Sequence, residues 1–200
     1  MVFPKLSEFT LAVLEDSGWY VVNYSQADNI TWGKNQGCDF FYNKCNGTNF
    51  REFCTVKEEK GCSFDKGGRA RCIEDKLADH CKYMLPYNNQ FCKEEKNEFP
   101  NDFLIANSFG PNSICVESNM KFPNIVILET PFPKHRCNKF ECRGENKTDL
   151  YLTLFEEDIK CSTKEEKIET FEHYKGYVIC PDPAEMCPAE QKPVQKRKKK

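Results

Sequence analysis

Cysteine and histidine are the residues of this sequence that most readily bind a metal or act in catalysis, and there are thirteen cysteines and three histidines. The histidines are His80, His135 and His173, and none lies four residues from another. The spacing H-E-x-x-H, which places two zinc ligands and a general base on one helix face, is therefore absent from the sequence. No cysteine has an identified histidine base that would activate it as a nucleophile. We therefore predict no catalytic residue, no metal ligand and no catalytic activity for this chain alone.

The cysteines favour disulfide bonds over a structural zinc site. Structural zinc usually takes its ligands in close pairs such as C-x2-C, and the closest two cysteines here are Cys137 and Cys142. The apolar content is 39% against 30% charged residues, and disulfides commonly compensate for a small core in an oxidising compartment. Because thirteen is odd, at least one cysteine lacks a partner within the chain. Structural zinc is the alternative that the spacing leaves open.

Charge and hydropathy limit the partners and the location of the chain. The net charge is −2, so no global field attracts nucleic acid, and we predict no nucleic-acid partner. No apolar run approaches the roughly 18 residues of a membrane span, and residues 1–13 lack the regions of a signal peptide. Because a disulfide-rich chain is expected to carry a targeting segment, we predict that this sequence is a fragment of a longer protein. Membrane attachment would then be possible only through segments that this sequence lacks.

The C-terminal residues 191–200 are predicted to form a basic disordered tail that ends in KRKKK. A nuclear signal, a contact with a polyanion and a juxtamembrane cluster are the functional alternatives for such a run of cations.

A short helix is predicted near the start of the sequence. Ser7 is a good N-cap, and Gly18 lies where a helix takes a left-handed terminator. Apolar residues surround this helix on nearly every side, and a helix of that kind is predicted to be buried. Trp19 and Tyr20 follow it at once. The first twenty residues therefore resemble the end of a domain whose body lies upstream.

The rest of the sequence indicates short strands separated by loops. The fold class that we predict is α+β: a buried N-terminal helix leads into a disulfide-rich C-terminal domain dominated by β-strands and loops. Residues 164–172 fit either a helix or a polar excursion, and residues 46–79 are predicted to be rich in loops. The predicted strands are residues 21–24, 40–42, 102–105, 113–116, 125–128, 150–155 and 177–180.

Two stretches resemble a known family. SEFTLAVLEDSGWY at 7–20 and WGKNQGCDFFYNKC at 32–45 are similar to the segment that follows the active site in leishmanolysin-type zinc metallopeptidases of the metzincin group. The resemblance implies that residues 1–37 are the end of the catalytic region and residues 38–190 a disulfide-rich C-terminal domain. It also implies a parent that uses zinc-activated water to cleave protein or peptide substrates at the cell surface or outside the cell. No zinc is expected to bind to this chain. Its expected partner is the missing upstream catalytic region.

The same resemblance implies a disulfide pairing. Cys38 would bridge to a cysteine in the missing catalytic region, which accounts for the odd number. The implied pairs are Cys45–Cys81, Cys54–Cys72, Cys62–Cys115, Cys92–Cys137, Cys142–Cys187 and Cys161–Cys180.

Four asparagines begin N-x-S/T sequons: Asn23, Asn29, Asn46 and Asn146. They predict N-glycosylation on surface loops in the secretory pathway, and unused sequons are the alternative.

Three functions compete at this stage. The first is the C-terminal region of a leishmanolysin-like endopeptidase, inactive by itself, with a link to cell adhesion that the resemblance implies. The second is a secreted, disulfide-rich adhesion or binding module. The third is a cytosolic cysteine-rich protein with a nuclear tail, for which thirteen free thiols would be the mark.

Overall fold

The structure is a computed structural model of the 200-residue chain. It describes residues 6–28, 30–45, 50–100, 102–123, 134–154 and 156–188. The predicted strand 125–128 and the basic tail 191–200 lie outside the described residues.

The predicted N-terminal helix forms as α1 (Glu8–Asp16). The Ser7 hydroxyl accepts a hydrogen bond from the Thr10 N–H at 3.0 Å, and Gly18 has a φ of +74° just beyond the helix. These two residues begin and end the helix for the reasons that the sequence indicates.

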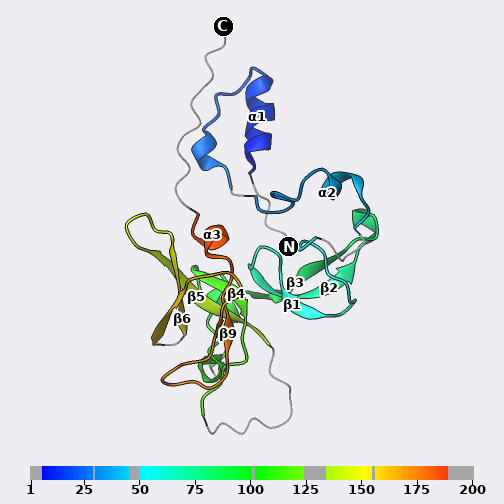
Figure 1. Ribbon diagram of the computed structural model, residues 1–200. Coiled ribbons are helices and arrows are strands. Elements are labelled where there is room, and N and C mark those ends of the chain that lie inside the picture. Colours follow the sequence, from blue (N-terminus) through cyan, green and yellow to red (C-terminus); the bar gives the residue numbers. More distant parts are fainter. Residues whose placement is uncertain are drawn as a thin grey trace.

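The predicted burial of α1 is not seen within the described residues of this chain. Leu11 is the one buried residue of the helix, whereas Phe9 is 84% exposed and Val13 is 70% exposed. The reason is that α1 stands apart from the sheets (Figure 1). It is tied to the following segment by polar contacts, such as the bond of 2.9 Å from the Tyr24 hydroxyl to Glu15, and these cover little apolar surface.

Three of the predicted strands do not form, and two of them are helical turns instead. Residues 21–24 run without regular structure into η1 (Tyr24–Gln26), residues 40–42 lie in α2 (Asp39–Tyr42), and residues 102–105 form η4 (Asp102–Ile105). Side-chain caps explain two of these errors. Asn23 accepts from the Ser25 N–H at 3.1 Å, and Asp102 accepts from the Phe99 N–H at 2.8 Å. Such local bonds compete with the ladder of a sheet.

The first sheet is antiparallel, and its first two strands lie in residues 46–79, which were predicted to be rich in loops. Its order is β1 (Lys60–Cys62), β2 (Gly68–Glu74) and β3 (Lys82–Phe91). The buried residues of β2 include Ala70 and Cys72, which are small, so the strand has a weak hydrophobic signal. The 3-10 turn η2 (Lys76–Ala78) connects β2 to β3, and η3 (Glu95–Asn97) follows β3.

The second sheet carries the core. It is antiparallel with the order β4 (Ser113–Glu117), β5 (His135–Arg143), β6 (Asp149–Leu154) and β7 (Glu157–Cys161). Side chains alternate along β6, and its inner face is completely buried against apolar residues of neighbouring elements. The core residues of that face are Leu150, Leu152 and Leu154. The predicted strands 113–116 and 150–155 therefore correspond to β4 and β6.

The C-terminal segment completes the second half of the molecule. Residues 167–168 and 178–179 pair as β8 (Lys167–Ile168) and β9 (Val178–Ile179), and the helical turn α3 (Pro183–Met186) follows. The stretch 164–172 is thus a polar excursion that contains a short strand. Asp182 caps α3 by accepting from the Ala184 N–H at 2.9 Å.

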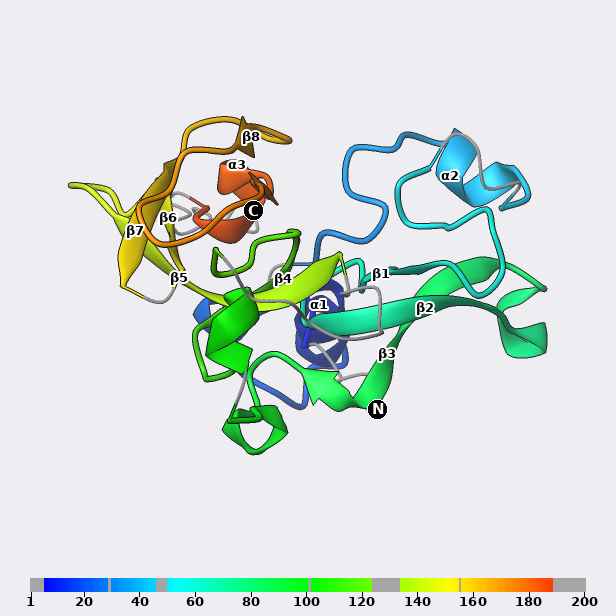
Figure 2. The same cartoon turned by 90° about the horizontal axis from the view of Figure 1, so that it is seen from below.

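Six disulfides connect these elements, and they are the same six pairs that the family resemblance implies. Two of them join the first sheet to the second. Cys62–Cys115 links β1 to β4, and Cys92–Cys137 links the residue after β3 to β5. Figure 2 shows the two sheets on opposite sides of the molecule, with β1 and β4 meeting between them.

The number of residues between two bridged cysteines predicts how much the disulfide contributes to the free energy of unfolding. Replacing both cysteines of Cys62–Cys115 by alanine should lower the free energy of unfolding by about 1 kcal/mol more than the same change at Cys54–Cys72. The separations are 53 and 18 residues, and each bridge has one fully buried cysteine, Cys115 and Cys72 respectively. Urea unfolding of both double variants measures the difference. Equal losses in the free energy of unfolding would contradict the prediction, since the longer loop should restrict the unfolded chain more.

Candidate functional site

The three described histidines do not assemble a zinc site. His80 contacts Glu74 with 3.1 Å between Nδ1 and Oε1, His135 begins β5, and His173 contacts Glu157 at 3.0 Å. Within the described ranges, no three or more His, Cys, Asp or Glu residues are grouped as a metal ion would require. A catalytic zinc needs three protein ligands. The described residues therefore do not fit zinc.

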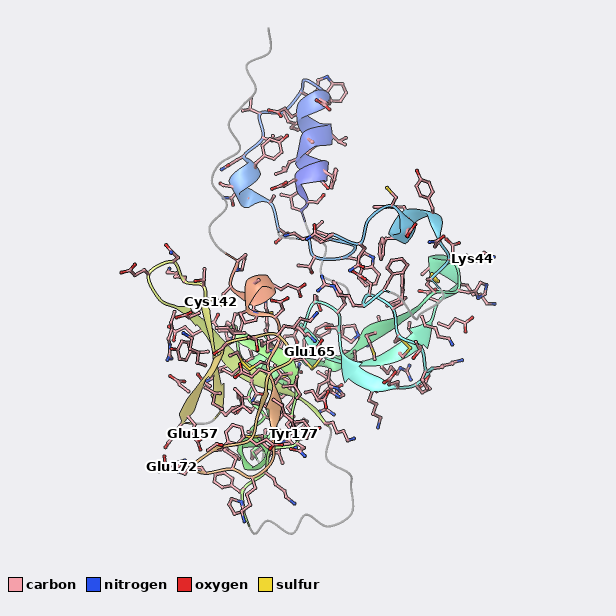
Figure 3. The ribbon with its side chains drawn as sticks, in the orientation of Figure 1. Lys44, Cys142, Glu157, Glu165, Glu172 and Tyr177 are labelled. Carbon is pink, nitrogen blue, oxygen red and sulfur yellow. A yellow bond between two sulfur atoms is a disulfide. The ribbon has the colours of Figure 1, made fainter. Side chains whose placement is uncertain are left out.

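The contact between Glu157 and His173 is a structural clamp. The Glu157 carboxylate accepts hydrogen bonds from the Glu172 N–H at 2.9 Å and from the His173 N–H at 2.6 Å. Figure 3 shows Glu157 and Glu172 close together beside the second sheet. Partial burial raises the pKa of Glu157, but the hydrogen bonds from the two N–H groups and the His173 ring outweigh it, so the pKa lies below its ordinary value.

The exposed face of α1 is a candidate contact surface. Besides Phe9 and Val13, the residues that follow the helix are open to solvent, with Trp19 85% exposed and Tyr20 and Val21 also exposed. An apolar patch that contains large aromatic residues is typical of a surface that binds another protein.

The exposed free thiol of Cys38 is a second candidate contact site. All thirteen cysteines are described, and Cys38 is the one without a bridge. It lies exposed at the N-terminal end of α2, which also exposes Phe41 and Tyr42.

An aromatic cluster positions Cys38 and α2. Phe40 points inward, and its ring stacks on Phe53 with 5.9 Å between centroids, while Trp32 meets Phe64 edge-on at 5.1 Å. The buried carboxylate of Glu52 accepts from the Gly33 N–H at 2.9 Å and fixes the turn before α2.

A groove of about 810 Å³ lies between the two halves of the molecule. Strand β1 lines it together with Lys66, His135, residues 179–182 and Glu185. Burial lowers the pKa of the His135 ring, and neighbouring Lys66 and Arg69 reinforce the effect over the opposing charge of Glu117. His135 is therefore neutral at pH 7.

The sequence did not predict this groove. Lys66 lies in a stretch with turn chemistry, between Asp65 and the pair Gly67 and Gly68. That turn is in the structure, with a φ of +57° at Lys66. Nothing in the sequence indicates that the turn reaches β4, where the Lys66 carbonyl accepts from the Cys115 N–H at 2.7 Å.

Two of the four sequons lie on described surface loops. Asn23 is exposed at the start of η1, and Asn146 is exposed in the turn between β5 and β6. Asn29 and Asn46 lie outside the described residues.

The family model for leishmanolysin, peptidase M8, matches residues 3–74 and 68–193, which is nearly the whole chain. The chain belongs to the leishmanolysin family. This family is a zinc-dependent class of metallopeptidases, so the predicted family is confirmed.

Relatives of this leishmanolysin-family chain are found in several animals and in a protozoan. It is 31% identical over 180 residues to a ciliated left-right organizer metallopeptidase of Danio rerio, covering 89% of this chain. It is 26% identical over 250 residues to a leishmanolysin-like peptidase of Drosophila melanogaster, covering 94% of this chain. It is 23% identical over 210 residues to the leishmanolysin of Leishmania major, covering 89% of this chain.

The chain spans about a third of the length of these relatives: 28%, 36% and 35% respectively. In the described part of the chain, no helix is both long enough and apolar enough to cross a bilayer.

The Glu157 clamp predicts a pH dependence of stability. Because the folded pKa is lowered, the contribution of the clamp is complete above the ordinary pKa of 4.5 and is lost as the pH falls through the folded pKa. Glu157→Gln should therefore cost about 1–2 kcal/mol at pH 7, and the cost should shrink at pH 3.5.

Urea unfolding at the two pH values measures this cost. Glu172→Gln is the matched control, since Glu172 joins the clamp through its backbone N–H alone among the bonds described. A cost that is the same at both pH values, or a control that behaves like Glu157→Gln, would contradict the prediction.

Proposed function

We propose that this chain is the C-terminal region of a leishmanolysin-like zinc metalloendopeptidase, and that it has no peptidase activity alone. In the parent protein, proteolysis of protein or peptide substrates would be the work of a catalytic region that carries the zinc. The described residues of this chain do not fit zinc, so no chemical step is assigned to them. The family match over residues 3–193 is the observation that carries this proposal.

The proposed domains follow the resemblance: residues 1–37 complete the catalytic region, residues 38–190 form the disulfide-rich domain, and residues 191–200 form a basic tail. The exposed apolar face of α1 supports this division. Burying a side chain such as Phe9 or Trp19 against a catalytic region would gain about 1.5–3 kcal/mol each.

The free thiol of Cys38 also supports a catalytic region as the partner of this chain. In this proposal its thiol bridges to a cysteine of the catalytic region, and the exposed rings of Phe41 and Tyr42 pack beside that bridge. Six disulfides in the chain suit an oxidising compartment, and we propose an extracellular or cell-surface location for the parent.

A secreted binding or adhesion module is the second candidate. The groove between the two halves favours it, since a cavity of this size is within the range of ligand sites. The two candidates differ in what should cover α1 and Cys38: the catalytic region in the first, and solvent in the second.

Activity and thiol labelling test the proposal together. The 200-residue chain should not cleave casein with or without added zinc, and a longer protein that includes the catalytic region should cleave it until a chelator is added. A maleimide should label one thiol of the chain, and none in the longer protein or in the chain with Cys38→Ser. Zinc-dependent turnover by the chain alone would overturn the proposal, and a labelled Cys38 in the longer protein would overturn the proposed bridge.

The sequons give a separate test of the secretory pathway. We expect Asn23 and Asn146 to carry N-glycans when the protein is secreted from animal cells, because both side chains are exposed. Asn23→Gln and Asn146→Gln should each remove one glycan mass, measured by mass spectrometry before and after enzymatic deglycosylation. Unchanged masses would mean that these two sequons are unused.

A further inference from the structure

Strand β1 has an open edge in the groove. It is the outer strand of the first sheet, whose order is β1-β2-β3, and all three of its residues line the groove. Among the described residues, no strand pairs with its outer side. An exposed edge of this kind is a template for a further strand.

The hydrogen-bond register shows which groups that edge offers. Glu59 accepts from the Cys72 N–H at 2.8 Å, and Ser63 donates to the Gly68 carbonyl at 2.9 Å. Because bonding alternates along an antiparallel pair, the main-chain groups of Lys60 and Cys62 face away from β2. Both residues line the groove, so their N–H and C=O groups are available to an occupant.

The groove also holds a cation without a partner. Lys66 is half-buried, and burial lowers the pKa of its amino group. In the described residues no carboxylate forms an ion pair with it, because the nearby acids are engaged elsewhere. Glu185 pairs with Arg51, and Glu117 accepts from the Tyr177 hydroxyl at 3.0 Å. A partly desolvated cation of this kind favours an anionic ligand group.

The opposite wall limits the kind of occupant. It includes residues 179–182 with Glu185 and Glu165, and Figure 3 labels Glu165 between the two sheets. Acidic and basic side chains are both present along the groove, so it is not a uniformly cationic surface for nucleic acid or a sulfated glycan. An occupant that places one anionic group beside Lys66 and carries no other charge matches this pattern.

We propose that this groove binds an extended peptide segment, which pairs with β1 as a fourth strand and places an acidic side chain against Lys66. The main chain would give the affinity through Lys60 and Cys62, and the carboxylate at Lys66 would give the specificity. The proposed site is complete within this chain, so it needs neither zinc nor the catalytic region.

Fluorescence anisotropy with the 200-residue chain tests the proposal. The probe is a fluorescein-labelled peptide, Thr-Val-Glu-Val-Thr-Val, which is extended by propensity and carries one carboxylate side chain. A second peptide has Gln in place of Glu. A third keeps Glu but is N-methylated at every residue after the first, so that neither edge of the peptide can donate main-chain hydrogen bonds to a strand. Heparin serves as the polyanion probe.

The matched variants are Lys66→Gln and Lys147→Gln. Both lysines have a positive φ, +57° and +52°, but Lys147 lies in the turn between β5 and β6 and not in the groove. The two substitutions therefore remove the same charge from the same backbone conformation. Circular dichroism of each variant shows whether it is folded.

We expect the Glu peptide to bind about tenfold more tightly than the Gln peptide to the natural chain and to Lys147→Gln. We expect Lys66→Gln to bind the two peptides equally, and N-methylation to abolish binding to every form. Lys60→Pro, which removes an outward N–H without breaking the ladder, should weaken both unmethylated peptides alike.

Equal binding of the Glu and Gln peptides to the natural chain would overturn the role of Lys66, and so would an equal effect of Lys147→Gln. Unchanged binding of the N-methylated peptide would overturn strand pairing. Binding of heparin without the peptides would assign the groove to a polyanion instead. None of these outcomes depends on peptidase activity, so failure here is distinguishable from failure of the proposed function.

Discussion

The two disulfides that join the sheets are the constraint on which the rest of the structure depends. The first sheet has little apolar surface of its own, because its buried strand β2 carries small residues such as Ala70 and Cys72. Cys62–Cys115 and Cys92–Cys137 hold it against β4 and β5, where Phe109 packs beside the bridges. The groove exists because these bridges fix β1 at a set distance from the C-terminal segment.

The second sheet is organised differently, around side-chain burial. The leucines of β6 pack against Ile114 and Val116 of β4. Arg136 is fully buried beside this core, and its guanidinium donates to the carbonyls of Ile105 and Met120. Burial lowers the pKa of Arg136 to about 10, so it remains charged at neutral pH and fastens η4 to the sheet.

Local signals in the sequence predict part of this fold. Ser7 and Gly18 set the ends of α1, and the apolar and β-branched content of residues 150–155 predicts the strand that forms as β6. The disulfide pairing came from the family resemblance, because spacing alone does not choose among so many pairings. Strand β2 was missed because residues 68–72 alternate small and charged residues, so its buried positions, Gly68, Ala70 and Cys72, lack the large apolar side chains of a typical strand. The apolar residues on every side of α1 predict that the helix is buried, and its early position predicts that the covering body lies upstream; within the described residues Leu11 is the one buried residue of the helix.

The order of the six bridges has a further consequence for the covalent structure. Four of them form overlapping loops from Cys45 to Cys137, and the other two form nested loops from Cys142 to Cys187. Residues 138–141 are the stretch of main chain that connects these two sets. Cleavage by a protease at any other bond between Cys45 and Cys187 would leave both fragments attached until a reductant is added. This stretch lies within β5, hydrogen-bonded between β4 and β6, so the one cut that would divide the bridged region falls inside a sheet and not in a loop.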